Sequence, residues 1–192
     1  MWRRLPPLLR AWLGVELRPV THAERLISGA GGLVAMLLVW KASALALGDR
    51  EPALLVAGSM GASAVLLFAV PHGPLSQPWA LVGGHLVSAL AGVACARLVP
   101  APFLAAALAV GLAILAMHYL RCIHPPGGGT ALGIVLAGPA VRRLGFGYAV
   151  APVLLDVAIL LVAAVAVNAL FAWRRYPAAL ARRPPAASPG RA

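Results

Sequence analysis

The chain is poor in acidic residues, lysine and cysteine, and these shortages narrow its class. Only five of its 192 residues are acidic and 11% are charged, whereas soluble domains carry about 25% charged residues. Lys41 is its single lysine, so the net charge of +11 comes almost wholly from arginine. Cys95 and Cys122 are expected to be buried apolar residues without a disulfide. The arginines cluster mostly outside the apolar stretches, so the positive charge does not indicate nucleic-acid binding.

Most of the chain is made of apolar residues. Hydrophobic residues make up 61% of the chain, and the mean hydropathy is +0.89. Because lipid cannot bond backbone polar groups, this composition predicts an all-α, polytopic helical membrane protein with the lipid bilayer as its main partner. The length suits one domain of several spans of about 20 residues each. Breaks rich in glycine and proline delimit six apolar segments: Leu26–Leu47, Ala53–Val70, Trp79–Val99, Phe103–Leu120, Gly129–Val141 and Tyr148–Trp173.

Arginine clusters at both ends predict the topology. Residues 1–25 should form a cytoplasmic or interfacial segment without a cleavable signal, 26–173 the transmembrane domain, and 174–192 a disordered basic tail rich in proline and alanine. Both termini should be cytoplasmic, in the inner or plasma membrane of the cell. The segment Gly129–Val141 would reach only about 20 Å as a helix. Four and six full crossings therefore both remain open.

The run at residues 124–130 (HPPGGGT) points most directly to a function. Two prolines followed by three glycines are expected to interrupt a helix, and irregular backbone at membrane depth is tolerated only when it is buried in protein or lines a cavity. The stretch Ala131–Val141 should then be a short helix whose first amides face that cavity. Free amides and the helix dipole attract anions, so the run predicts a site for a small anion.

A short internal sequence similarity, which we call the echo, supports this interpretation. Residues 61–65 (GASAV) and 128–132 (GGTAL) match in character at an offset of 67. Each would be the second segment of a three-segment unit, which favours an inverted 3+3 repeat with two short half-helices and a site between them. Close packing of helices through small residues is the alternative explanation. The candidate substrate-binding residues from this echo are Gly61, Ser63, Gly128, Gly129 and Thr130.

Four ordered motifs make the chain resemble the HPP family of integral membrane proteins. They are GASAVLLF at 61–68, PLSQP at 74–78, GGHL at 83–86 and RCIHPPGG at 121–128. The resemblance implies a membrane unit usually described with four transmembrane helices, and the family includes members implicated in nitrite transport. The chain departs from the family pattern at three positions. Ala80 stands where we expect asparagine, and Gly129 and Asp156 stand where family members often have alanine and glycine, respectively. These departures bear on which anion is transported.

Three ionisable residues complete the candidate binding site. Arg121 can either reach the interface or place its guanidinium beside the cavity. A buried neutral His85 needs only one hydrogen bond, but its place in a family motif makes it a candidate, as is His124. His118 and Cys122 are four residues apart without a nearby carboxylate, so no metal and no cofactor are predicted.

Lys41 and Asp156 are expected at matching depths in their spans, about 9 and 12 Å from the outer ends. A lone charge at that depth is costly, so mutual pairing is one hypothesis, and either residue could then couple proton movement to transport. The alternative is that Lys41 extends to the interface while Asp156 is protonated or bonded to a neighbour.

These observations predict membrane transport of a small monovalent anion, with nitrite as the leading candidate. A non-transporting scaffold or assembly protein is the first alternative. An intramembrane enzyme is the second, although the sequence has no HExxH helix or recognised serine elbow, and we expect no enzymatic activity. Whether the protein is a channel or a coupled transporter, and whether it forms a homo-oligomer, stay open.

Overall fold

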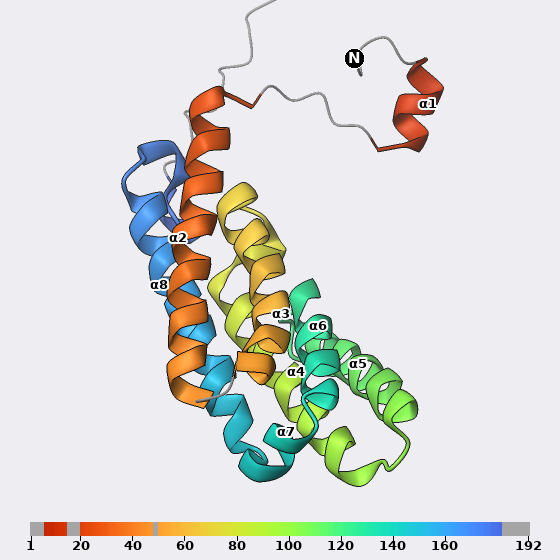
Figure 1. Ribbon diagram of the computed structural model, residues 1–192. Helices are drawn as coiled ribbons and strands as arrows, with labels where there is room; N and C mark the ends of the chain where they lie inside the picture. The colour runs from red at the N-terminus through yellow and green to blue at the C-terminus, as the bar shows by residue number, and fades with distance from the viewer. Residues whose placement is uncertain (1–5, 15–19, 48–49, 182–192) are drawn as a thin grey trace, which may run out of the picture.

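The computed structural model describes residues 6–14, 20–47 and 50–181, and its regular elements in that part of the chain are all helical (Figure 1). The helices that begin at residues 78, 102 and 125 start with proline, whose fixed φ suits the first turn and whose missing N–H has no partner there anyway. The elements are α1 (Pro7–Trp12), α2 (His22–Leu47), α3 (Arg50–Ala69), η2 (Pro74–Ser76), α4 (Pro78–Leu98), α5 (Pro102–Tyr119), α6 (Pro125–Leu136), α7 (Pro139–Leu144), η3 (Ala149–Leu154), α8 (Leu155–Ala169), η4 (Ala172–Arg174) and η5 (Ala178–Leu180).

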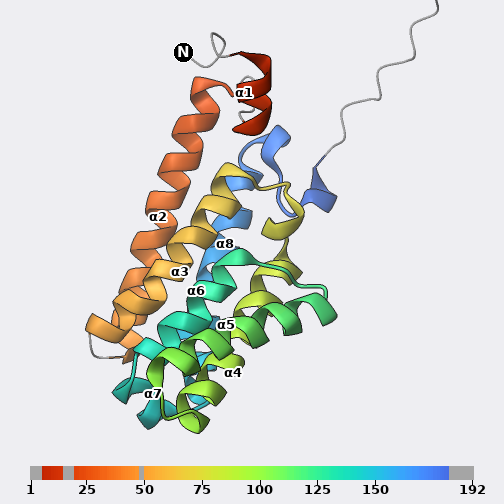
Figure 2. The same ribbon diagram turned by 90° about the vertical axis from the view of Figure 1, so that its right-hand side faces the viewer.

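The structure confirms a polytopic helical membrane protein. Four helical stretches in the described part are long and apolar enough to span a bilayer: α2, α4, α5 and the stretch Ala149–Ala169. Between them α3 and α6 return the chain, so the segments alternate in direction and both described ends of the bundle lie on one side (Figure 2). We call this the terminal side.

Helix packing follows the predicted repeat. If α2, α3 and α4 form one unit and α5, α6 and α8 the other, the contact of α2 with α3 corresponds to that of α5 with α6. In the same way, the contact of α2 with α8 corresponds to that of α5 with α4, and the contact of α4 with α6 corresponds to that of α8 with α3. The contacts of α3 with α6 and of α4 with α8 join equivalent helices of the two units. Equivalent helices run in opposite directions (Figure 1). The pattern is that of an inverted repeat, in which α3 and α6 meet at the centre.

The predicted interruption at residues 124–130 is wrong. Helix α6 begins at Pro125 and runs through all three glycines. Pro125 and Pro126 occupy its first two positions, where proline is favoured rather than disruptive. The two predicted half-helices are also unequal, because α6 has 12 residues but α3 has 20.

The first residues of the predicted disordered tail, 174–181, lie in the described part of the chain and contact the bundle. Arg174 is buried and donates to Asn168 Oδ1 at 3.1 Å, Glu24 Oε1 at 3.0 Å and Ser28 Oγ at 3.2 Å, and also to the Phe68 carbonyl. This guanidinium therefore joins the ends of α2, α3 and α8, and a buried arginine with several acceptors has its donors used. Residues 182–192 of the predicted tail, and much of the predicted segment 1–25, lie outside the described residues.

The first prediction concerns topology. Reporter fusions at Arg18 and after Tyr176 should give the same reading, because the bundle brings both ends to one side, and that reading should be cytoplasmic because arginine clusters stay inside. Alkaline phosphatase and fluorescent-protein fusions would measure it. Opposite readings at the two ends would contradict the fold, and two external readings would contradict the orientation.

Candidate functional site

Five polar side chains form one buried hydrogen-bonded cluster between α3, α4 and α6, which we call the polar network. Ser63 Oγ lies 2.8 Å from His85 Nε2 and 2.8 Å from His124 Nε2. His85 Nδ1 lies 2.7 Å from Thr130 Oγ1, which lies 2.9 Å from Ser59 Oγ. All five side chains are buried, and the two imidazoles meet edge to face with centroids 4.9 Å apart. The network is Ser59, Ser63, His85, His124 and Thr130.

Glycines let the backbones approach closely enough to form the network. A Cβ on Gly84 would lie 2.5 Å from His124 Cβ, and one on Gly83 would lie 2.8 Å from Cys122 Cβ. A Cβ on Gly127 would lie 2.9 Å from the Gly84 carbonyl oxygen. The residues preceding α6 therefore pass directly over α4, and this contact places His124 above His85.

The loop before α4 orients His124. His124 Nδ1 lies 2.8 Å from the carbonyl oxygen of Leu75. The loop is held from both sides, since Ser76 Oγ donates to the Leu66 carbonyl and Tyr176 Oη donates to the Ser76 carbonyl at 2.7 Å. Burial raises the pKa of Tyr176, so its hydroxyl keeps the proton that it donates.

Hydrogen-bond chemistry sets part of the direction of the network. A carbonyl only accepts, so a neutral His124 carries its proton on Nδ1, and its Nε2 is an acceptor that faces Ser63. Ser63 has one proton to give, and the Ser59 carbonyl at 3.2 Å is an acceptor for it as well as His124 Nε2. Thr130 Oγ1 donates to Ser59 Oγ at 2.9 Å and lies 2.7 Å from His85 Nδ1. A cationic imidazole would be costly here, because no carboxylate bonds to either ring.

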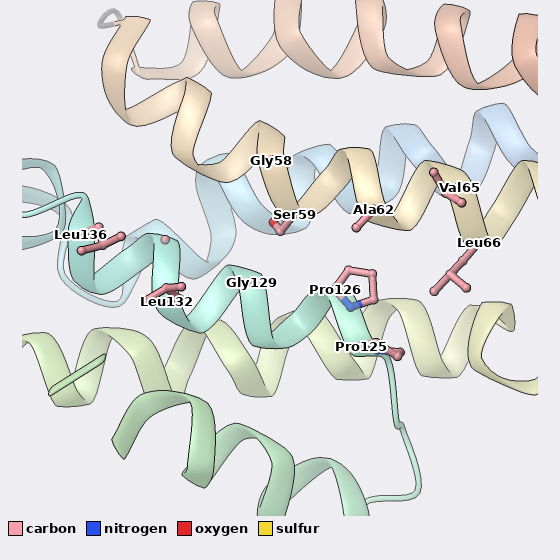
Figure 3. Close-up of a pocket in the computed structure, with 11 residues that line it drawn as sticks. Gly58, Ser59, Ala62, Val65, Leu66, Pro125, Pro126, Gly129, Leu132 and Leu136 are labelled. Atoms are coloured by element: carbon pink, nitrogen blue, oxygen red, sulfur yellow. The ribbon is translucent and has the colours of Figure 1, made fainter. Parts of the chain in front are cut away.

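An open groove of about 720 Å³ between α3 and α6 reaches one end of the network (Figure 3). Its walls are apolar, and Ser59 supplies the hydroxyl in its lining. Pro125 and Pro126 close the end nearest the terminal side. The network thus extends from the Ser59 hydroxyl at the groove to the Leu75 carbonyl in the loop before α4. The groove is lined by Gly58, Ser59, Ala62, Val65, Leu66, Pro125, Pro126, Gly129, Leu132, Gly133 and Leu136.

Four of the predicted binding residues, Ser63, His85, His124 and Thr130, lie together in this network. The other four lie apart from its hydrogen bonds. Gly129 lines the groove, Gly128 faces α5, and Gly61 faces Met36 on α2. Arg121 is exposed and ends α5 in a left-handed conformation with φ 55°.

The predicted anion site at the free amides of α6 is wrong. Pro125 and Pro126 have no N–H, and the Gly127 N–H is bonded to the His124 carbonyl at 2.8 Å. Thr130 lies in the second turn of the helix rather than before its first turn. Side-chain hydroxyls and imidazoles, rather than helix amides, are the donors that this site offers.

The structure also does not form the suggested pair of Lys41 and Asp156. Asp156 is fully buried and accepts from Ser43, while its Oδ1 has no hydrogen-bond partner. Lys41 is exposed and borders an outward-facing apolar groove between α2 and α8. The two helices pack together, but Ser43, two residues further along α2, is the residue that meets Asp156.

The sequence analysis did not identify two residues that take part in these hydrogen bonds, Ser59 and Leu75. Ser59 stands one helical turn before Ser63, so both hydroxyls share a face of α3, and this i, i+4 spacing was the available signal. Leu75 acts through its backbone carbonyl, and its side-chain type in the sequence gives no indication of that contact. Among the described residues, no group of three His, Cys, Asp or Glu side chains is placed to hold a metal ion.

Comparison with known proteins agrees with the fold. The family model for the HPP transmembrane region matches residues 17–177. Two Dictyostelium discoideum proteins described as transmembrane proteins are similar: one is 40% identical over 178 residues and the other 37% over 179 residues. Each alignment covers 88% of this chain, and 55% and 61% of the relatives, so the chain spans little more than half of their length. No solved structure matches the chain.

The fold and the network define the protein as a polytopic helical membrane protein with a buried histidine–hydroxyl cluster. The chain belongs to the HPP family of membrane proteins, whose transmembrane region accounts for most of its length.

The second prediction separates two adjacent glycines of α6. Gly127→Ala should lower the thermal unfolding temperature, because its Cβ would meet Ser88 Oγ at 2.7 Å and the α4 backbone at 2.9 Å, an overpacking that costs about 1–3 kcal/mol. Gly128→Ala is the control, because its Cβ would meet only Val110 Cγ1 at 3.9 Å. It should be neutral or slightly stabilising. Thermal unfolding in detergent followed by size-exclusion chromatography would measure both, and equal effects would contradict the packing described.

Proposed function

We propose that this protein transports a small monovalent anion across the membrane, with nitrite as the expected substrate. The observation that supports this most is the polar network itself. Five hydrogen-bonding side chains lie buried together beside the apolar core, and intramembrane polar groups usually mark an ion or substrate path. The network contains hydroxyls and imidazoles but no carboxylate, so it can offer donors, and when protonated a positive charge, to an anion.

The position of the network also suits a transporter. Transporters built from inverted repeats bind their substrates where the two repeats meet. Here Ser63 of one repeat and Thr130 of the other hold opposite nitrogens of His85. A change in the packing of α3 against α6 would therefore alter the site directly.

The charge of the molecule favours anions as well. The net charge is +11, and exposed arginines lie at both ends of the bundle, with Arg121 at the terminal side and Arg97 and Arg143 at the other. Clusters of one sign raise the local concentration of the opposite ion.

A serine–histidine enzyme is the second candidate, because Ser63 contacts an imidazole whose Nδ1 is oriented by a carbonyl, as in a catalytic triad. The geometry is unfavourable for catalysis. Ser63 is fully buried, and both its donor and its acceptor capacity are used by the two histidines. Labelling of Ser63 by a fluorophosphonate would support this candidate over transport.

The third prediction concerns flux. Purified protein in liposomes should pass nitrite, and also nitrate, faster than sulfate, because a divalent ion costs far more to desolvate. Ser63→Ala and Thr130→Ala should each weaken apparent nitrite affinity by about 1 kcal/mol or more, since each leaves a buried partner unbonded.

Thr21→Ala is the matched control, because Thr21 is exposed and its hydroxyl accepts from the Glu24 backbone N–H at the start of α2, away from the polar network. It should leave flux unchanged. Cation flux without anion flux, or unchanged affinity in both folded network variants, would contradict the proposal.

A further inference from the structure

We propose that the outward-facing groove between α2 and α8 binds one anionic phospholipid, whose acyl chain lies along the groove and whose phosphate meets the ammonium group of Lys41. We call it the lysine groove. Its volume is about 640 Å³, within the range of about 300–1,000 Å³ that is usual for small-molecule sites. It shares no lining residue with the groove between α3 and α6, so the inference does not depend on the proposed anion transport.

The lysine groove is about as long as one leaflet of a bilayer. Its lining residues cover positions 34–45 of α2, about 17 Å of helix, and 158–167 of α8, about 14 Å. The hydrocarbon core of a bilayer is about 30 Å thick, so one leaflet contributes about 15 Å. Helix α2 begins on the terminal side (Figure 2), so these positions belong to its far half. One acyl chain of the leaflet opposite the terminal side therefore fits along the groove.

Lys41 lies near the headgroup end of the lysine groove. It precedes the end of α2 at Leu47 by about 9 Å of helix. Its neighbour Trp40 is exposed as well, and tryptophan is enriched at the membrane interface. A lysine at this level keeps its methylene stem on apolar surface and extends its ammonium group to the headgroups. Lys41 is also the single side chain in the groove lining that is not apolar.

The Lys41 ammonium group needs a counter-ion. Lys41 is exposed, and no carboxylate among the described residues forms an ion pair with it. Asp156 is buried and accepts from Ser43, while Glu24 pairs with Arg174 near the other end of α2. A charge at membrane depth is costly without a partner, and basic pockets between transmembrane helices bind anionic headgroups. The phosphate of a lipid supplies the missing anion.

A second copy of the chain fits the lysine groove less well than a lipid does. In a two-fold dimer the same patch of each copy meets itself. Two Lys41 side chains would then enter one apolar interface, and no acidic side chain lines the groove to pair with them. Like charges placed together in an interface oppose association.

Native mass spectrometry of the full chain, delipidated in detergent, tests the charge. The protein is titrated with phosphatidylglycerol and with phosphatidylcholine of the same acyl chains, and the two first dissociation constants are compared. We expect phosphatidylglycerol to bind about fivefold more tightly, the preference that one lysine near a headgroup gives. Lys41→Gln should bring the ratio to about one, whereas Lys41→Arg should keep it. Equal binding of the two lipids by the unaltered chain, or an unchanged ratio in Lys41→Gln, would overturn the inference.

Arg175→Gln is the matched charge control, because Arg175 is exposed near the end of the described chain, away from the lysine groove. It should leave the ratio at about fivefold. Loss of the preference in this variant too would mean that the lipid responds to net charge rather than to the groove, which would overturn the inference.

A groove-filling variant tests the place of the acyl chain. Ala166 is exposed and lines the lysine groove, so Ala166→Phe should displace the acyl chain and lower the ratio towards one although Lys41 is intact. Ala107→Phe enlarges an exposed alanine of α5 outside the groove and should keep the ratio. An unchanged preference in Ala166→Phe would overturn the inference. A dimer of the unaltered chain that Ala166→Phe dissociates would assign the groove to a second copy and would overturn it as well.

Discussion

The requirement that every polar atom in an apolar interior find a partner is the constraint on which the site depends. Five side chains satisfy one another between three helices, and the chain of bonds ends on a backbone carbonyl that can only accept. That one carbonyl sets the tautomer of a neutral His124. Because an unpaired buried partner costs about 1–3 kcal/mol, loss of any one member affects the whole network.

Close packing of the backbone positions the side chains that form these hydrogen bonds. The glycines at 83, 84 and 127 bring the segment before α6 onto α4, while the loop before α4 is fixed by Tyr176, Ser76 and Gln77. Gln77 donates to the Pro71 and Gly73 carbonyls and accepts from the Ala178 N–H. The hydrogen bonds of the PLSQP motif therefore fix the position of the Leu75 carbonyl.

Much of the fold could be predicted from the sequence, because hydropathy and helix-breaking residues depend on local chemistry. The helical segments followed from them, and the echo named Ser63 and Thr130, two hydroxyls that both contact His85. The interruption at residues 124–130 was misjudged because proline at the first helical positions is favourable, and because the glycines serve close packing rather than a bend. Ser43 as the partner of Asp156, and Leu75 as that of His124, depend on tertiary contacts that no spacing in the sequence encodes.

The hydrogen bond between the His124 ring and the Leu75 carbonyl is the central claim, and the tautomer of His124 tests it most directly. Solid-state NMR of protein with 15N-labelled histidine, in lipid at neutral pH without added anion, distinguishes protonated from unprotonated ring nitrogens. Spectra of His85→Gln and His124→Gln variants assign the two rings. The account predicts a neutral His124 with its proton on Nδ1, where the Leu75 carbonyl lies 2.8 Å away. A His124 with its proton on Nε2, or an imidazolium in the resting protein, would contradict it.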